Sequence, residues 1–148
     1  MNALLTWAVL AVVGFVACAE FGSYAFVHPV MRRLPAREQV AFERGLLNTF
    51  GRVMPVGMTL SPILIGSWAA TQQGTTALLA GVAAIAAVIA LATTIAVNVG
   101  INRATRLWDP DHPPQDWQAT RRRWDRFQGV RSWLLLVAYL ILVAAVAG

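Results

Sequence analysis

The sequence has few of the side chains that most metal, redox and nucleotide sites require. Its 148 residues include one cysteine, two histidines and seven acidic residues, and all twelve basic residues are arginines. A single cysteine excludes an intramolecular disulfide bond and a cysteine-rich zinc or iron–sulfur site. No glycine-rich phosphate loop or nucleotide fingerprint is present. Because His112 falls in a predicted loop, one chain cannot build a two-histidine iron site inside a helix bundle, so we predict no metal site.

Long apolar runs dominate what is present. Apolar residues make up 57% of the chain, and the mean hydropathy is +0.58; both are high for a soluble domain. About 20 helical residues cross a hydrocarbon core of roughly 30 Å, and only a helix satisfies its own backbone in lipid. We therefore predict an all-α fold, with residues 1–148 forming a single integral membrane domain. The predicted spans are at about residues 4–27, 46–70, 76–99 and 130–147.

The arginines predict the orientation of these spans. They fall in two groups, within residues 32–52 and 103–131, whereas the two ends of the chain and the connection at residues 71–76 have none. By the positive-inside rule, loops one (28–45) and three (102–129) face the cytoplasm and both termini lie outside, as in a multi-pass protein of a bacterial-type inner (plasma) membrane. The net charge of +5 then indicates membrane lipids with anionic headgroups as partners, and not nucleic acid.

Loop three contains turn signals followed by a helical pattern. Asp109-Pro110 marks a turn, and Asp116 precedes Trp117 and an arginine run, as a helix cap would. Tryptophan and arginine on one helix indicate an amphipathic helix at the headgroup level. The complete fold prediction is a four-transmembrane-helix antiparallel bundle with an interfacial amphipathic helix between helices three and four. The tryptophans predicted to anchor the chain at the interface are Trp108, Trp117, Trp124 and Trp133.

Each predicted span carries polar residues about one helical turn apart. They are Glu20, Tyr24 and His28 in the first span, Asn48, Arg52 and Thr59 in the second, Thr94, Asn98 and Asn102 in the third, and Gln128, Arg131 and Tyr139 in the fourth. Antiparallel threading brings most of them to one level, in the cytoplasmic half of the bilayer. A bundle that is polar at this end alone predicts a cavity open to the cytoplasmic leaflet.

Glu20 is the only acidic residue within a predicted span. Burying such a charge in lipid costs about 2.5–3.5 kcal/mol on insertion scales, so we expect it to face the bundle interior near Arg131 or Arg52. It is either an acid–base group or half of a structural ion pair. His28 is either a second acid–base group or the residue that ends a helix beside Pro29.

The remaining polar residues have similar alternatives. The asparagines would bind substrate or form hydrogen bonds between helices, and an arginine near the interface would bind substrate or extend toward the headgroups. We predict as catalytic residues Glu20, His28 and Tyr24. We predict as substrate-binding residues Asn48, Asn98, Asn102, Arg131, Gln128 and Arg52.

Short motifs along most of the chain resemble the anthrone oxygenase-like family of small four-helix membrane proteins, which was long catalogued as a domain of unknown function. These motifs are Phe26-Val27-His28-Pro29 with Asn48, Phe50 and Pro55, then Asn98-Val99-Gly100-Ile101-Asn102, Trp108-Asp109-Pro110, Pro113-Pro114, Trp117, Arg121-Arg122-Arg123-Trp124 and Arg131. The resemblance implies a four-helix membrane fold. For some members it also implies oxygenation of a polycyclic anthrone to a quinone without an obvious bound cofactor.

The function predicted from this resemblance is that of a membrane-embedded oxidoreductase, an anthrone-type monooxygenase acting on a small hydrophobic aromatic substrate. The sequence requires no cofactor, and dioxygen would be the co-substrate. One alternative is a non-catalytic membrane protein that binds a lipid, a quinone or a partner protein. A second is a small proton-coupled transporter with Glu20 as the coupling acid. A ridge of small residues at Ala86, Ala90 and Thr94 would also allow a homo-oligomer.

Overall fold

The structure, a computed structural model, describes residues 3–148 and contains only helices and their connections in that range. Two of the helical stretches are interrupted by a π-helical turn. The elements are α1 (Ala3–Gly22), the π-turn η1 (Ser23–Val27), α2 (His28–Met31), α3 (Ala36–Asn48), α4 (Phe50–Ala69), α5 (Gly74–Thr93), the π-turn η2 (Thr94–Asn98), α6 (Val99–Leu107) and α7 (Trp117–Ala147). The all-helical prediction is confirmed for this range; the first two residues of the predicted domain lie outside it.

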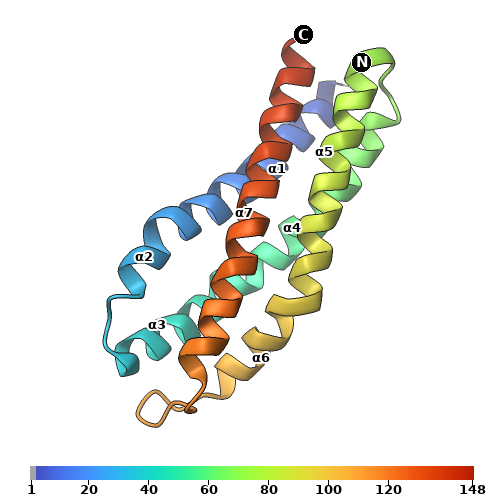
Figure 1. Ribbon diagram of the computed structural model, residues 1–148. Helices are drawn as coiled ribbons and strands as arrows, with labels where there is room; N and C mark the ends of the chain where they lie inside the picture. The colour runs from blue at the N-terminus through green and yellow to red at the C-terminus, as the bar shows by residue number, and fades with distance from the viewer. Residues whose placement is uncertain (1–2) are drawn as a thin grey trace.

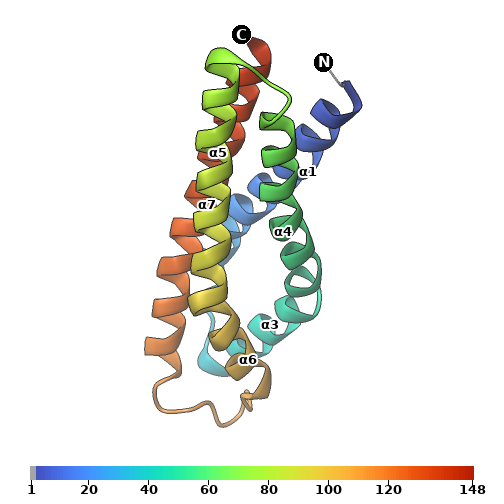
Figure 2. The ribbon, with the colours of Figure 1, turned by 90° about the vertical axis from the view of Figure 1, so that its right-hand side faces the viewer.

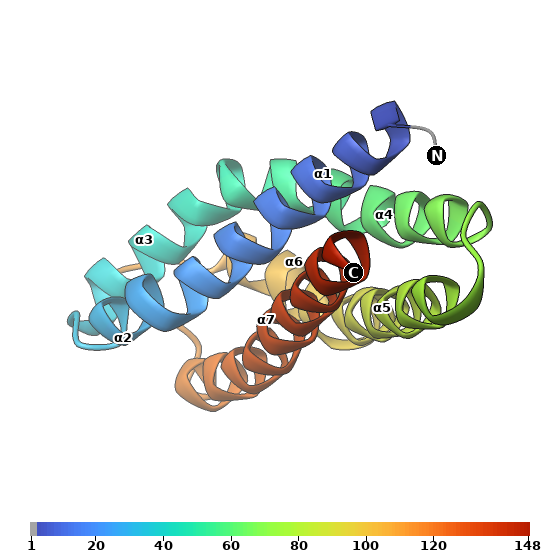
Figure 3. The same cartoon turned by 90° about the horizontal axis from the view of Figure 1, so that it is seen from above.

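Four long helices pack in a ring, in which α1 contacts α4, α4 contacts α5, α5 contacts α7 and α7 contacts α1. Consecutive helices run in opposite directions (Figure 1). The C-terminus, the start of α1 and the α4–α5 connection lie at one end, which we call the terminal end. The α2–α3 connection and the α6–α7 loop lie at the other, which we call the loop end (Figures 1 and 2). Figure 3 shows the molecule from above, from the terminal end.

Three helical stretches in residues 3–148 are long and apolar enough to cross a membrane: Ala3–Met31, Gly74–Leu107 and Trp117–Ala147. They contain the predicted first, third and fourth spans and extend each of them at the loop end. The predicted second span begins differently, because Thr49 leaves helical geometry (φ −111°, ψ −80°) and separates α3 from α4. Residues 46–48 therefore end α3 instead of starting a membrane helix.

The separate interfacial helix predicted in loop three is not present. Residues 117–147 form one continuous helix, α7, in which the arginine-rich segment is the N-terminal extension of the last span. Trp117 and Trp124 are also 9% and 8% exposed, so they pack inside the protein, and Trp108 is similarly buried. Trp108 and Trp117 form a small cluster with Val40 of α3. Of the predicted anchors, only Trp133 is exposed, at 53%.

Small residues make up much of the buried core in the terminal half of the ring, together with the larger Ile65, Trp68 and Leu142. Its buried cluster includes Val9, Val13, Ala83, Ala87 and Ala138, all at most 1% exposed. Small side chains let helix backbones approach closely in lipid, where association depends on van der Waals contact. The loop half is different, because its buried residues are largely polar and charged. The candidate functional site lies there.

Candidate functional site

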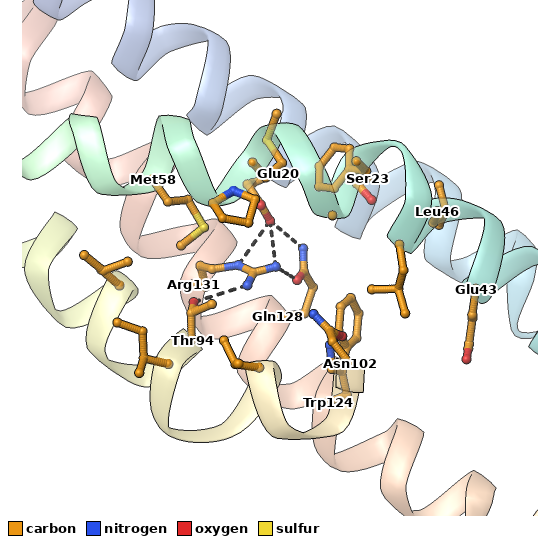
Figure 4. Close-up of a pocket in the computed structure, with 18 of the residues that line it drawn as sticks. Glu20, Ser23, Glu43, Leu46, Met58, Thr94, Asn102, Trp124, Gln128 and Arg131 are labelled. Carbon is orange, nitrogen blue, oxygen red and sulfur yellow. Dashed lines mark hydrogen bonds and ion pairs between the residues drawn. The ribbon is translucent and has the colours of Figure 1, made fainter. Parts of the chain in front are cut away.

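A cavity of about 180 Å³ opens in the loop half of the ring. Apolar side chains of α3, α4 and α5, among them Met54 and Met58, form one part of its wall. Polar, charged and aromatic side chains from α1, α2, α3, α6, α7 and the two π-turns form most of the rest (Figure 4). The polar and charged lining residues are Glu20, Ser23, His28, Glu43, Thr59, Thr94, Asn102, Arg121, Gln128 and Arg131. An apolar enclosure with a few converging polar groups is typical of small-molecule sites.

The first polar group of the cavity is centred on Glu20, which is 1% exposed. Its Oε2 accepts hydrogen bonds from Gln128 Nε2 at 2.7 Å and from Arg131 Nε at 3.1 Å (Figure 4). Arg131 also donates to Thr94 Oγ1 at 3.2 Å and to Gln128 Oε1. The other carboxylate oxygen, Glu20 Oε1, is buried and has no hydrogen-bond partner within residues 3–148. That oxygen can accept a hydrogen bond from a ligand.

The second polar group is centred on His28, which is also 1% exposed. His28 Nδ1 lies 3.0 Å from Asp125 Oδ1, and Arg32 donates to Asp125 Oδ2 at 3.4 Å. The imidazole stacks on the Trp124 ring with centroids 5.0 Å apart and an interplanar angle of 9°. A carboxylate on Nδ1 sets the tautomer in which Nε2 carries the free lone pair. None of the hydrogen bonds of the described residues involves Nε2, and His28 lines the cavity.

A third polar group lines the cavity from α3 and from the start of α7. Glu43 of α3 is 2% exposed, and its Oε2 lies 2.8 Å from Arg121 Nε. Gln39 Nε2 donates to Glu43 Oε1 at 3.0 Å. The Arg121 guanidinium carbon is also 4.2 Å from the centre of the Trp124 ring, a cation–π contact. Burial raises the pKa of Glu43 from its ordinary value of 4.5, against the opposing attraction of Arg121.

The π-turn η1 brings Glu20 and His28 to the same side of the first helix. In a regular α-helix, residues eight apart differ by about 80° in direction, because each residue turns the chain by about 100°. A π-turn accommodates one extra residue, so the eight steps behave as about seven, and the difference falls to roughly 20°. Tyr24 lies within this turn and points elsewhere. It packs on α7, where a Cβ added to Gly129 would lie 2.9 Å from Tyr24 Cε2.

The structure brings several of the predicted site residues together. Glu20, His28, Asn102, Gln128 and Arg131 line one cavity. Asn102 Oδ1 accepts a hydrogen bond from Trp124 Nε1 at 2.7 Å, which holds the tryptophan against His28.

Four predicted site residues do not line this cavity. Asn98 is buried and donates to the Trp124 backbone carbonyl at 3.3 Å. Tyr24 borders grooves on the outer side of α7, and Arg52 is exposed beside a groove between α1 and α4. Asn48 is exposed near the end of α3. Spacing along a regular helix does not reveal these positions, because the π-turn and the break at Thr49 change the direction of the helix faces.

Sequence reasoning did not single out Glu43 and Arg121, which line the cavity, or Asp125, which contacts the cavity-lining His28. All three lie in predicted cytoplasmic loops, where charged side chains are usually solvated. The signal for Asp125 was its position one helical turn before Gln128, on the face that continues to Arg131. Glu43 had no comparable signal, because the folding back of α3 over the loop end is a tertiary feature.

The groups offered to a ligand are an imidazole, carboxylates and guanidinium groups. Within residues 3–148, no cluster of three or more histidine, cysteine, aspartate or glutamate side chains has a metal-binding arrangement. A positioned imidazole can accept a proton, and guanidinium and amide N–H groups can stabilise a developing oxyanion. The cavity therefore combines a base with groups suited to an anionic intermediate.

Comparison with known proteins identifies the family. A family model described as anthrone oxygenase matches residues 39–141. The match includes Glu43, Asp125, Gln128 and Arg131, and it begins after the helix that carries Glu20 and His28. Neither the curated proteins nor the solved structures compared with the chain include a match. Because the family model covers more than half of the sequence, the chain belongs to the anthrone oxygenase family.

Proposed function

We propose that this chain is a membrane-embedded oxygenase that oxidises a small hydrophobic aromatic substrate in the cavity of the loop half. One observation carries the proposal: His28, held by Asp125 at 3.0 Å, faces the same small cavity as the Glu20–Arg131 pair. A histidine oriented by a carboxylate is a recurring arrangement for a general base. A fixed cation nearby favours an anionic intermediate.

The proposed reaction begins with removal of a proton from an activated CH₂ group of the substrate by His28 Nε2. The resulting delocalised anion supplies electrons to dioxygen, and the C–O bond that forms gives a hydroperoxide after proton return from His28. Loss of water from CH–OOH leaves a carbonyl, so CH₂ and O₂ become C=O and H₂O. Both the atoms and the electrons balance without an external reductant, because the substrate carbon is oxidised as dioxygen is reduced.

Glu20 has a different role in this proposal from that of a base. Its charge is paired with Arg131, and Gln128 also occupies Oε2. The open Oε1 is an acceptor for a substrate hydroxyl, and the paired guanidinium faces the oxygen that becomes anionic. The Glu20–Arg131 pair would therefore orient the substrate, while proton transfer occurs at His28.

The cavity volume constrains the substrate. A void of about 150 Å³ holds one benzene molecule, so the 180 Å³ cavity accepts a little more than one ring without rearrangement. A three-ring substrate would require displacement of the flexible Met54 and Met58 side chains in the wall. Substitution of these methionines would therefore alter which ring systems are accepted.

The proposed membrane arrangement has α4 as a fourth span, with both termini outside and the loop end in the cytoplasm. Large apolar side chains of α4 point outward, including Val56 and Ile63 at 61% and 58% exposed. Lipid is the environment that favours such a surface beside three other apolar helices. The arginine-rich loops then lie on the cytoplasmic side. Cysteines introduced in place of Gln72 and Asp111 test this arrangement by their accessibility to a thiol reagent added from one side of the membrane. Labelling of residue 111 from the outside would contradict the arrangement.

Oxygen uptake with an anthrone tests the function. The purified protein should consume one O₂ for each carbonyl formed, and His28→Gln should lower this rate by about 10²-fold or more. His112→Gln is the matched control, because His112 is exposed in the α6–α7 loop. A rate for His28→Gln equal to that of the control would contradict the assignment of the base.

A non-catalytic binding protein is the second candidate, favoured by the extensive pairing of charges around the cavity. It predicts saturable binding of an aromatic ligand without oxygen uptake. Transport is less well supported, because apolar side chains such as Val13, Ile65 and Leu142 pack the terminal half at 0% exposure. A proton path would have to pass through this packed region.

A further inference from the structure

A groove lies outside the cavity, on the surface where α7 runs beside α1 and η1 (Figure 3). We propose that this surface binds an anionic phospholipid, with its acyl chain along α7 and its phosphate among arginines at the loop end. We call it the α7 groove. It does not depend on the proposed oxygenase activity, and its residues are separate from those that line the cavity.

The part of the α7 groove nearer the terminal end is apolar. It has a volume of about 640 Å³ and is lined by Gly129, Val130, Trp133, Leu134 and Val137, with Tyr24 and Arg126 at one end. Val130, Trp133 and Val137 are 44–53% exposed. From Arg126 to Val137 the helix rises about 16 Å at 1.5 Å per residue. This length matches about half of a hydrocarbon core of roughly 30 Å, the depth that one acyl chain occupies.

The part of the α7 groove nearer the loop end is charged. An adjoining groove of about 390 Å³ is lined by Tyr24, Arg32, Arg122, Asp125 and Arg126. Since Tyr24 and Arg126 line both parts, the apolar and charged surfaces are continuous. Three arginines face one carboxylate, and that carboxylate is already bound to His28 and Arg32. Arg122 and Arg126 are exposed and have no acidic partner within residues 3–148.

This order of groups matches an anionic phospholipid in particular. A fatty chain requires the exposed apolar face, and a phosphate requires donors at the end of that face; guanidinium groups bind phosphate through paired N–H donors. A zwitterionic lipid has the same chain but adds a cation that three arginines repel. A comparable groove between α1 and α4 has an apolar wall but a single arginine, Arg52. It therefore serves as an internal comparison.

Fluorescence quenching tests the α7 groove, because Trp133 lies in its wall. The protein is reconstituted into bilayer discs of phosphatidylcholine that contain a small fraction of lipid with brominated acyl chains. The brominated lipid is either phosphatidylglycerol or phosphatidylcholine. We expect stronger quenching by brominated phosphatidylglycerol, and we expect Trp133→Phe to remove the difference. A preference that persists in Trp133→Phe would place the lipid elsewhere and overturn the proposal.

The charged part is tested with Arg122→Gln/Arg126→Gln. Removing basic residues near a membrane weakens anionic lipid binding by roughly fivefold for each residue, so the preference for phosphatidylglycerol should fall by about 25-fold or be lost. The control Arg52→Gln/Arg103→Gln removes the same charge from exposed positions outside the α7 groove and should change the preference by less than about twofold. Equal losses in the two variants would show a general charge effect and overturn the proposal. If the double variant does not fold, the single variants Arg126→Gln and Arg52→Gln are compared in the same way.

Discussion

His28 and Asp125 are 97 positions apart in the sequence, yet His28 Nδ1 lies 3.0 Å from Asp125 Oδ1. This contact joins the end of the first membrane helix to the arginine-rich start of α7. It also leaves the opposite ring nitrogen of this buried, cavity-lining histidine without a hydrogen bond among the described residues. The Asp125 carboxylate and the stacked Trp124 ring are the two groups of α7 that orient the imidazole among the described residues.

Asp125→Asn should lower the oxygen-uptake rate with an anthrone by about 10²-fold or more. The amide keeps the size of the side chain but can stabilise the wrong tautomer of His28, as happens when the aspartate of a Ser-His-Asp triad is replaced by asparagine. Substrate affinity should change little, since Asp125 lies behind the imidazole. Asp116→Asn, at an exposed position, is the control. A wild-type rate for Asp125→Asn would remove Asp125 from the mechanism.

Glu20→Gln should destabilise the protein by about 3–5 kcal/mol, because it leaves the buried Arg131 guanidinium without a carboxylate. The double variant Glu20→Gln/Arg131→Gln should recover a large part of this loss, since it removes both charges. Thermal unfolding in detergent micelles, with the exposed Glu38→Gln as control, measures both effects. Additive losses in the double variant would mean that the two side chains do not stabilise each other.

Glu43 predicts a pH dependence of stability. Burial raises the pKa of Glu43 in the folded protein above 4.5, so the folded state binds more protons than the unfolded state between these two pKa values. The contribution of Glu43 to stability is therefore greatest below pH 4.5 and decreases as the pH rises through the raised pKa. As the pH rises over this range, the unfolding temperature of the wild type should fall relative to that of Glu43→Gln. A difference that is independent of pH would contradict the raised pKa.

Gly57→Ala should destabilise the contact between α1 and α4 by about 1–3 kcal/mol through overpacking. An added Cβ would lie 2.5 Å from Val16 Cγ2, and Val16 is completely buried. Gly66→Ala, in the same helix and with no atom within 4 Å of the added Cβ, should instead stabilise by up to about 1 kcal/mol through helix propensity. Val16→Ala should relieve the Gly57→Ala defect. Equal unfolding temperatures for the two alanine variants would contradict the close approach.

The sequence predicted best those elements that are marked by a long apolar run or by a group of charged residues. Apolar runs and arginine groups predicted three helices that the structure also has, and the lone acidic residue of the first run predicted a buried partner. Glu20 does pair with Arg131, one of the two cations named in advance. These predictions succeed because hydropathy and charge act on each segment separately, whatever its neighbours are.

Other expectations failed where the helix geometry is not regular. Equal spacing placed Tyr24 with Glu20 and His28, but η1 rotates it toward Gly129. Loop three was expected to contain a separate interfacial helix, yet α7 continues without a break from Trp117 to Ala147. Hydropathy changes sharply near residue 127, and a composition-based prediction takes this change for a boundary although the backbone hydrogen bonds continue across it.

Apolar length, arginine placement and the rarity of buried charge are properties of the chain in one dimension, and they determine that it is helical and suited to a membrane. Which polar groups share a cavity was decided only by the packing of the helices. Two π-turns change the direction of helix faces, Thr49 folds α3 back over the loop end, and the start of α7 carries Asp125 to His28. The contact between His28 and Asp125 joins segments 97 positions apart, and hydropathy within either segment does not specify its partner.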